Sequence, residues 1–130
     1  MITIKNFYVD TTKKVDVVPV GHEVRALIRE AKAEKGWVIL QAPTSGASFL
    51  SLENQEKKVE GLKKALEGFS IKDLFSCFLP GSFCLLVEKG KLTIDPWQEV
   101  FLVDYEVSGR RREYSIQVYS EAVTEGNEPQ

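Results

Sequence analysis

A short loop rich in hydroxyl groups follows an apolar segment and is the first candidate for ligand binding. Residues 37–42 are apolar except for Gln41 and are followed by Pro43, Thr44, Ser45 and Gly46. Hydroxyl groups and free backbone N–H groups around a glycine can bind an anion. The loop lacks the lysine and the spacing of a P-loop, and small polar residues are also typical of an ordinary turn. We therefore predict ligand binding by Thr44, Ser45 and Gly46, with a plain turn as the alternative.

Three consecutive arginines at 110–112 are the second candidate. They follow Ser108 and Gly109, so the sequence places their guanidinium groups at a turn between two strands. An arginine can hold a carboxylate or a phosphate through two parallel hydrogen bonds. We expect Arg110 and Arg112 to bind an anion, and the alternative is a charged run covered by solvent.

A Trp-Gln pair begins one predicted strand, and a glutamate ends another. Tryptophan is most often a core residue, but the pair at Trp97 and Gln98 follows an Asp-Pro step and is more specific than a core requires. We add Trp97, Gln98 and Glu53 to the predicted ligand-binding residues. Carboxylates can also act as a general acid and base where burial or a like charge shifts one pKa toward neutrality. A catalytic alternative would use Glu53 with Asp95 or Asp104.

Imidazole and thiol groups are scarce. His22 is the one histidine, and it stands at the predicted start of a helix, where an exposed first-turn residue is the simplest interpretation. Cys77 and Cys84 are seven positions apart in apolar surroundings, which is not a metal-binding spacing. We expect both cysteines to be buried and reduced. The sequence therefore predicts no metal site and no cofactor, and nothing in its spacing favours a Ser/His/Asp triad.

Length and charge limit the class of protein. The chain has 130 residues, 43% of them apolar, with 17 Lys plus Arg against 19 Asp plus Glu, which suits one globular domain. Three of the acids lie in 120–130, so residues 1–119 carry 17 minus 16, a formal charge of plus one. This balance excludes a simple electrostatic nucleic-acid binder. No apolar run approaches the roughly 20 residues that span a bilayer, and we expect no signal peptide. We predict a cytoplasmic domain over 1–119 and a disordered acidic tail over 120–130.

Hydrophobic periodicity predicts a mixture of strands and helices. Alternation predicts an antiparallel hairpin from 2–9 and 13–20, with Pro19 at a sheet edge. Helical spacing predicts a helix from Gly21 that is closed by a left-handed Gly36, a second helix over 54–67 and a short helical turn over 70–78. A buried central strand over 37–42 is followed by predicted strands at 48–52, 82–87, 91–94, 98–105 and 113–119. The predicted fold class is α+β, a compact mixed or antiparallel β-sandwich with two or three helices.

The order of four sequence blocks resembles the YjbQ-like proteins, also called the secondary thiamine-phosphate synthase enzyme family, over most of 1–119. The strongest block, at 90–100, is Gly-Lys-Leu-Thr-Ile-Asp-Pro-Trp-Gln-Glu-Val, similar to the family's Gly-Arg-Leu-x-Leu-Gly-Thr-Trp-Gln-x-Ile. Residues 104–106 and 110–112 resemble its acidic-aromatic-Asp-Gly-Pro-Arg-x-Arg segment with one residue inserted. Residues 43–48 and 53–54 resemble a Pro-His-Thr-Thr-Ala-Gly strand that ends in Asn-Glu-Asn, and 82–87 stands where the family has Ser-x-x-Ile-Pro-Val.

The departures from the family pattern concern its histidines. Thr44 stands where the family has the histidine of its Pro-His-Thr-Thr turn. Only 28 residues separate Glu53 from Ser82, too few for the family's helix and its segment with further histidines. The resemblance implies a compact α+β sandwich that assembles as a homotrimer with clefts between subunits. Without those ligands, it does not extend to the family's metal-linked site or its weak thiamine-phosphate synthase activity.

Together, these observations predict a metal-free homotrimer that binds a small phosphorylated or carboxylated metabolite or serves as an assembly module. Neither a nucleic acid nor a membrane is expected as a partner. One alternative is a weak enzyme that uses the carboxylates named above. The other is a purely structural homo-oligomer whose interface uses the Trp, Gln and Arg side chains. The residues predicted to line the cleft are Thr44, Ser45, Gly46, Glu53, Trp97, Gln98, Arg110 and Arg112.

Overall fold

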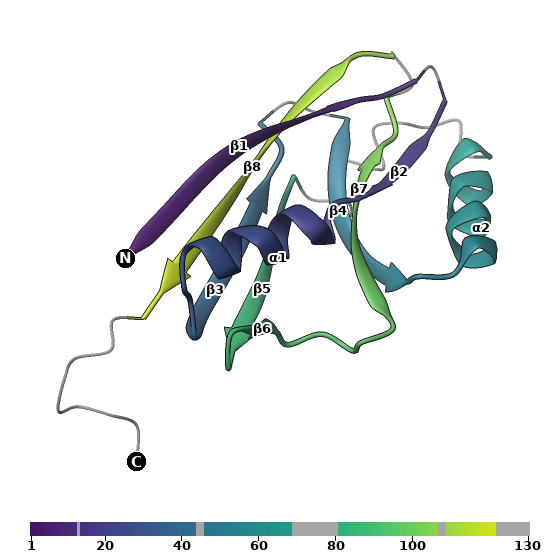
Figure 1. Ribbon diagram of the computed structural model, residues 1–130. Helices are drawn as coiled ribbons and strands as arrows, with labels where there is room; N and C mark the ends of the chain where they lie inside the picture. The colour runs from purple at the N-terminus through teal and green to yellow at the C-terminus, as the bar shows by residue number, and fades with distance from the viewer. Residues whose placement is uncertain (13, 44–45, 69–80, 107–108, 122–130) are drawn as a thin grey trace, which may run out of the picture.

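A computed structural model describes residues 1–12, 14–43, 46–68, 81–106 and 109–121 of the chain (Figure 1). Eight strands and two helices lie in these ranges. In chain order they are β1 (Ile2–Asp10), β2 (Asp16–Pro19), α1 (Gly21–Glu30), β3 (Lys35–Gln41), β4 (Ala47–Glu53), α2 (Glu56–Glu67), β5 (Ser82–Glu88), β6 (Lys91–Leu92), β7 (Gln98–Asp104) and β8 (Arg111–Ser120).

The strands form two sheets in which every neighbouring pair is antiparallel. One sheet has five strands in the order β1-β8-β3-β5-β6, and the other has three in the order β2-β7-β4. The predicted α+β class with a mainly antiparallel β-sandwich is therefore confirmed, with two helices in the described ranges. The helical turn predicted over 70–78 and the tail over 122–130 lie outside those ranges.

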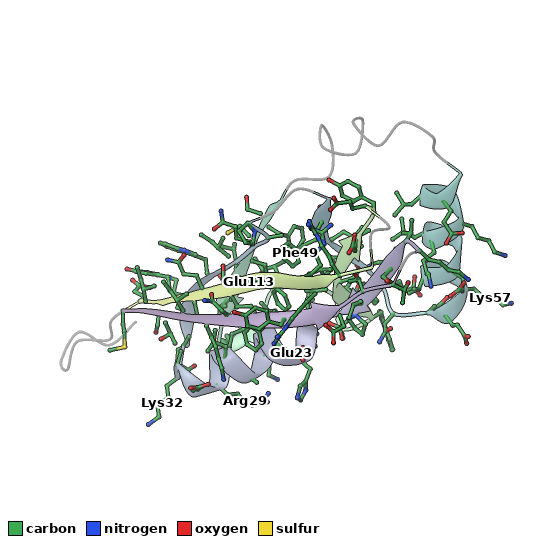
Figure 2. The ribbon with its side chains drawn as sticks, turned by 90° about the horizontal axis from the view of Figure 1, so that it is seen from above. Glu23, Arg29, Lys32, Phe49, Lys57 and Glu113 are labelled. Carbon is green, nitrogen blue, oxygen red and sulfur yellow. The ribbon has the colours of Figure 1, made fainter. Side chains whose placement is uncertain are left out.

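The main core lies between the inner face of the five-stranded sheet and two elements that cover it, α1 and the three-stranded sheet (Figure 1). Leu27 of α1, Leu40 of β3 and Phe49 of β4 are among its fully buried side chains. Burying one such side chain stabilises the fold by about 1.5–3 kcal/mol. A smaller cluster forms where α2 covers the other face of the three-stranded sheet, with Leu66 against Val103. Figure 2 shows α1 along β1 and β8 and α2 at the opposite end of the molecule.

The predicted hairpin between the first two strands is wrong. β1 pairs with β8 along its whole length, from Ile2 opposite Tyr119 to Asp10 opposite Arg111, whereas β2 pairs with β7. Alternation shows which face of a strand is buried, but it does not show which strand is its neighbour. The chain therefore crosses from one sheet to the other after Asp10. Pro19 does end β2, an edge strand, as predicted.

The end of the first helix also differs from the prediction. α1 ends at Glu30, and Lys32 at φ 53° takes the left-handed conformation that was expected of Gly36. Gly36 lies inside β3 instead, where a Cβ atom would be 1.8 Å from the backbone oxygen of Tyr119. The glycine is therefore needed for close approach between strands.

Several local expectations hold, and others need correction. β3 is central, as predicted, but alternate residues are buried, and Trp37 lies exposed on its outer face. The chain turns between the predicted strands 82–87 and 91–94, with Lys89 and Gly90 both at positive φ. Cys84 is exposed rather than buried, because its side chain lies on the outer face of β5, whereas that of the neighbouring Leu85 is buried on the inner face. Cys77 is outside the described residues. No helix in the described ranges is long and apolar enough to cross a membrane.

Candidate functional site

The predicted site residues do not form one cleft within a single chain. Thr44 and Ser45 lie outside the described residues. Gly46, Arg110 and Arg112 lie near the end of β7 that carries Asp104, which is paired with Ala47 at the start of β4. Residues 53, 97 and 98 lie at the opposite end, where Glu53 pairs with Gln98. Six residue steps of β4 separate the two ends, which is about 20 Å at the rise of a strand.

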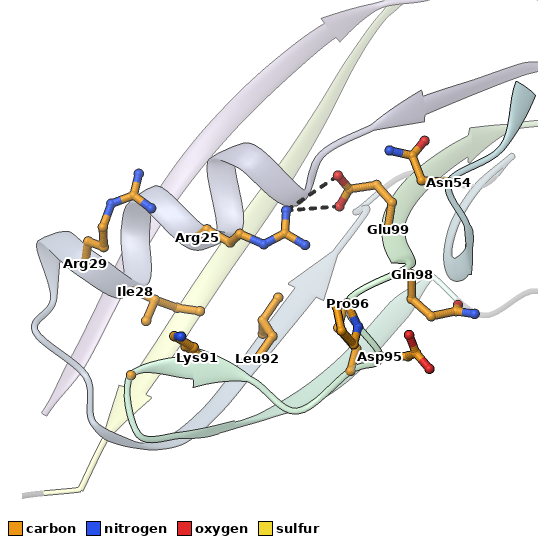
Figure 3. A pocket seen from close by; sticks show the side chains of 12 residues that line it. Arg25, Ile28, Arg29, Asn54, Lys91, Leu92, Asp95, Pro96, Gln98 and Glu99 are labelled. Carbon is orange, nitrogen blue, oxygen red and sulfur yellow. Dashed lines mark hydrogen bonds and ion pairs between the residues drawn. The ribbon is translucent and has the colours of Figure 1, made fainter.

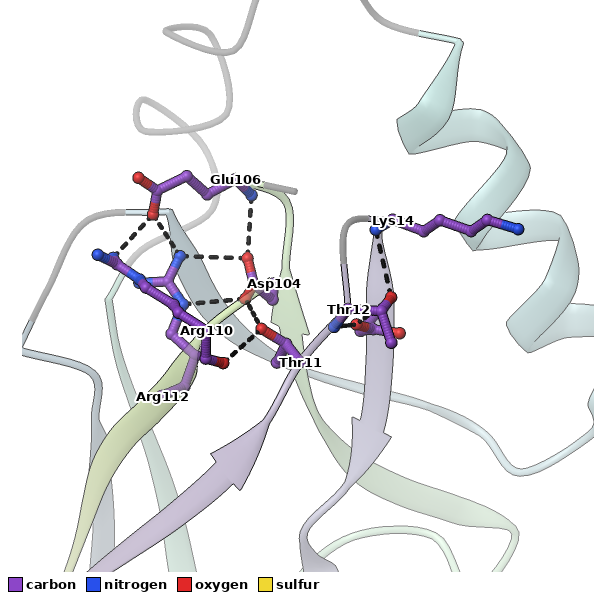
Figure 4. A network of polar contacts seen from close by, with 8 residues as sticks. Thr11, Thr12, Lys14, Asp104, Glu106, Arg110 and Arg112 are labelled. Atoms are coloured by element: carbon purple, nitrogen blue, oxygen red, sulfur yellow. Dashed lines mark hydrogen bonds and ion pairs between the residues drawn. The ribbon is translucent and has the colours of Figure 1, made fainter. Parts of the chain in front are cut away.

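A buried ion pair dominates the first end (Figure 4). The Arg112 guanidinium donates from Nε to Oδ2 of Asp104 at 3.0 Å and from Nη2 to Oδ1 at 3.1 Å. Their side chains are 1% and 0% exposed. The Thr11 hydroxyl also donates to Asp104 Oδ2 at 2.6 Å, and the backbone N–H of Glu106 donates to Oδ1 at 3.0 Å. This bidentate pair joins β8 of one sheet to β7 of the other.

Two further contacts extend the ion pair into a network. Glu106 Oε2 accepts from Arg112 Nη2 at 2.5 Å and from Arg110 Nη2 at 2.8 Å. Gly46 sits against this network at φ +92°, and a Cβ atom there would be 2.6 Å from Arg112 Nη2. The alternative interpretation of 110–112, a charged run covered by solvent, is therefore wrong for Arg112. It is buried because β8 begins at Arg111 and its second residue points into the sandwich.

The electrostatics of this network favour its ionised form. Burial by itself raises the pKa of Asp104, but the hydrogen bonds from Arg112, Thr11 and the Glu106 backbone together hold it below its usual value. Burial by itself lowers the pKa of Arg112, but the hydrogen bonds and charges of Asp104 and Glu106 raise it more. The pKa of Arg112 is therefore above its usual value. Because its guanidinium already binds two carboxylates, Arg112 acts as a link between sheets rather than as an open anion receptor.

Contacts at the second end are more exposed than the ion pair between Arg112 and Asp104. The Ser51 hydroxyl donates to Gln98 Oε1 at 2.8 Å, and Glu53 binds Lys58 and the Gln55 side chain. Asp95 accepts the backbone N–H of Trp97 at 2.9 Å. The Trp97 side chain is 72% exposed, so it is not a core residue in the single chain.

A cavity of about 750 Å³ lies beside this end, between α1 and the chain from 90 to 99 (Figure 3). Its size is in the range of small-molecule sites. Of the six predicted site residues that the structure describes, Gln98 alone lines it. Apolar lining is supplied by Ile28, Leu92, Ile94 and Pro96, and polar lining by Arg25, Arg29, Asn54, Lys91, Asp95, Gln98 and Glu99.

Charge in the cavity is concentrated on α1. Arg25 and Arg29 lie one turn apart, so both reach the same side of the helix. Arg25 Nη1 lies 3.3 and 3.4 Å from the two Glu99 oxygens, whereas Arg29 is exposed and forms no ion pair with a carboxylate of the described ranges. Lys91, which also lines the cavity, pairs with Glu88 across the β5–β6 hairpin.

Glu99 fits closely against the start of α1. Its Oε1 accepts the backbone N–H of Val100 at 2.9 Å, and a Cβ atom on Gly21 would be 1.7 Å from the same oxygen. Glycine at the first position of α1 therefore leaves the space in which Glu99 meets Arg25. The cavity is therefore lined by two guanidinium groups, that of Arg25, which is paired with Glu99, and that of Arg29, which is exposed.

Sequence reasoning missed most of this cavity. In the sequence, Arg25 and Arg29 lie on the polar face of the helix predicted from Gly21, and such a face usually contacts solvent. The available signal was their spacing of four residues, but the opposite wall comes from a segment more than sixty residues away. In the sequence, Asn54 belongs to the family-like residues 53–54 and to the helix predicted over 54–67, and neither pattern indicates a ligand.

The catalytic alternative is restricted by the register. Glu53 and Asp104 lie at opposite ends of the paired strands β4 and β7, so they cannot act together in one chain. The pairing of Glu53 with Asp95 stays a prediction. Among the described residues, no group of three or more His, Cys, Asp and Glu side chains is arranged to hold a metal ion.

The chain is similar to known proteins in both sequence and structure. No family model matches the chain. The UPF0047 protein YugU of Bacillus subtilis is 21% identical over 118 residues, covering 79% of this chain and 89% of that protein.

Solved structures share the fold over almost their whole length. A crystal structure described as a YbjQ-like protein of unknown function from Sulfolobus solfataricus has a TM-score of 0.84 at 18% identity, covering 93% of this chain and 99% of that one. An uncharacterised YjbQ/UPF0047 protein from Clostridium acetobutylicum has a TM-score of 0.78 at 13% identity, covering 88% and 99%. The chain is therefore similar in sequence to the UPF0047 protein YugU and shares the fold of solved YjbQ-like proteins.

Proposed function

We propose that this YjbQ-like protein binds a small metabolite carrying a carboxylate or phosphate group in the cavity beneath α1, without a metal ion. We also propose that it assembles with copies of itself, as the family resemblance implies. The ligand-binding part differs from the sequence prediction in its location, because the arginines that serve it are on α1 rather than at 110–112.

The observation that carries this proposal is the pair Arg25 and Arg29 on the wall of the cavity. Guanidinium groups bind carboxylate and phosphate oxygens through charge-assisted hydrogen bonds. Arg29 is exposed at the cavity, while Arg25 is bridged to Glu99, so an entering anion meets Arg29 first and can then compete with Glu99 for Arg25.

The rest of the lining suits a ligand with more than one kind of group. Ile28 and Leu92 offer apolar contact beside the guanidinium groups, and the amides of Asn54 and Gln98 lie toward the other end of the cavity (Figure 3). Amides both donate and accept hydrogen bonds, so they can bind a hydroxyl or carbonyl group. This combination supports an organic anion with a short polar extension.

Calorimetric titration of the wild-type chain with inorganic phosphate and with succinate, at constant ionic strength, tests this function. Binding of at least one probe is expected. Arg29→Ala should weaken it about tenfold or more, because a hydrogen bond to a charged group contributes about 1.5–3 kcal/mol.

Arg111→Ala is the matched control, because it removes the same charge from an exposed arginine that stacks on the Tyr8 ring at 4.2 Å, away from the cavity. Its affinity should equal that of the wild type. Equal weakening by both substitutions would reveal a general charge effect, and the proposed site would then be rejected.

A further inference from the structure

Side chains of both charges line the cavity beneath α1. Among the described residues, three cationic and two anionic side chains contribute to its wall: Arg25, Arg29, Lys91, Asp95 and Glu99. A ligand with negative charge alone is attracted by the guanidinium groups but repelled by the carboxylates. A ligand that carries one charge of each sign is attracted by both kinds of side chain. The lining therefore favours a zwitterion over a plain anion.

The ion pair between Arg25 and Glu99 is looser than the other cross-strand pair of the fold. Arg25 reaches the two Glu99 oxygens through Nη1, at 3.3 and 3.4 Å, whereas bonds between charged groups are usually about 2.7–2.9 Å long. Arg112, by contrast, uses Nε and Nη2 for separate oxygens of Asp104. The side chains of Arg25 and Glu99 are also 41% and 15% exposed. The pair at the cavity is therefore open to a further partner.

Specific atoms of this pair keep capacity for a ligand. Glu99 Oε1 accepts the Val100 N–H at 2.9 Å as well as the contact from Arg25, but Oε2 has the 3.4 Å contact alone within the described ranges. No hydrogen bond to a described residue occupies Nε or Nη2 of Arg25. A carboxylate oxygen can accept two hydrogen bonds, and both of these nitrogens donate. An acceptor and two donors are therefore available next to each other at the cavity.

We propose that the cavity binds a free α-amino acid with an apolar side chain. Its carboxylate binds the remaining donors of Arg25 together with Arg29, and its ammonium group binds Glu99 Oε2. Both charged groups of an α-amino acid are attached to one carbon atom, so their partners must be neighbours, as Arg25 and Glu99 are. This inference rests on the anion site proposed above and names the class of its ligand.

The rest of the wall provides a surface for the apolar side chain of such a ligand. Leu92 and Ile94 are partly buried and pack against the main core, and Ile28 belongs to that core. Figure 3 shows Ile28 and Leu92 below Arg25, so this surface adjoins the guanidinium group. Aliphatic groups of the wall and the ligand both leave water when they meet.

Glu99 is held in place before any ligand arrives. The Val100 N–H fixes its Oε1 atom, and Gly21 leaves the space beside it, since a Cβ atom on Gly21 would lie 1.7 Å from that oxygen. A side chain that is already ordered loses little conformational freedom on binding. Glu99 is therefore suited to be the residue that determines specificity for an ammonium group.

Calorimetric titration with two matched ligands tests this inference. L-leucine and 4-methylpentanoate have the same carboxylate and the same carbon skeleton, but 4-methylpentanoate lacks the amino group. At pH 7 and constant ionic strength, the wild-type chain should bind L-leucine about tenfold or more tightly than 4-methylpentanoate, because hydrogen bonds to charged groups are the stronger ones.

Glu99→Gln should change the two affinities in opposite directions. It should weaken L-leucine binding about tenfold, because the partner of the ammonium group loses its charge. It should strengthen 4-methylpentanoate binding, because no internal carboxylate then competes for Arg25. Glu113→Gln is the matched control, since it removes the same charge from an exposed position on β8, and both affinities should equal those of the wild type.

Equal affinity of the wild type for the two ligands would overturn the inference, and so would an equal change of both affinities in Glu99→Gln. If Glu99→Gln does not fold, the wild-type comparison decides by itself. Titrations with phosphate and succinate separate this inference from the proposed function. Binding of either anion without binding of L-leucine rejects the amino acid and keeps the anion site, whereas binding of none of the four probes rejects both.

Discussion

Asp104→Asn is expected to lower the free energy of unfolding by about 3 kcal/mol or more at pH 7, because removal of one partner leaves an uncompensated buried charge. Arg112 would keep Glu106, but it would lose the carboxylate that accepts from its Nε and Nη2 atoms. Urea unfolding of both proteins measures the difference. Glu106→Gln is the control, and its loss should be smaller because Glu106 is partly exposed. Equal losses would contradict the central place of Asp104 in the network.

The same substitution should also change the dependence of stability on pH. The pKa of Asp104 is lower in the folded chain than its ordinary value of about 3.9, so the carboxylate stabilises the fold at pH values above that. This contribution is lost as the pH falls through the folded-state pKa. The difference in stability between wild type and Asp104→Asn should therefore be full at pH 7 and shrink below about pH 4. A difference that stayed constant down to pH 2 would contradict the assignment.

Gly36→Ala is expected to destabilise the fold by about 3 kcal/mol, at the upper end of the effects of overpacking. The new Cβ atom would lie 1.8 Å from the backbone oxygen of Tyr119. That oxygen belongs to a strand paired with β1 and β3, so it cannot move aside without disturbing both neighbours. Thermal and urea unfolding measure the loss.

Gly61→Ala provides a control of opposite sign. Gly61 lies within α2 and a Cβ atom there would have no heavy atom within 4 Å. Alanine should therefore stabilise the helix by about 0.5–1 kcal/mol. A Gly36→Ala protein as stable as the wild type would show that β3 and β8 do not approach as closely as described.

Local patterns in the sequence predicted the elements that depend on neighbouring residues. The helical spacing of Leu62 and Leu66 identified α2, and the Lys89-Gly90 step identified the turn between β5 and β6. Strand partners were harder to predict, because alternation is a property of one strand. β1 pairs with β8, which begins more than a hundred residues further along the chain, and no local sequence pattern distinguishes this partner from β2.

The candidate site was less predictable for a related reason. Arg112 stands in a run of three arginines, a context typical of solvent-exposed charge. It can be buried because Asp104, on a strand of the other sheet, forms an ion pair with it. Arg25 and Arg29 had the context of a polar helix face, and only the chain from 90 to 99 turns that face into a cavity wall. Gln98 was identified because the Trp-Gln pair is unusual in its own right. Charged residues therefore gain their roles from tertiary neighbours that periodicity does not reveal.

A phosphate titration followed by the NMR signals of arginine Nε–H groups and side-chain amides tests the central claim most directly. The claim is that an anion binds beside α1 and not beside the 104–112 network. Added phosphate should shift the signals of Arg25 and Arg29 and the amide of Gln98, while Arg112, held by Asp104, stays unchanged. Shifts confined to Arg110 and Arg112, with Arg25 and Arg29 unaffected, would contradict the claim.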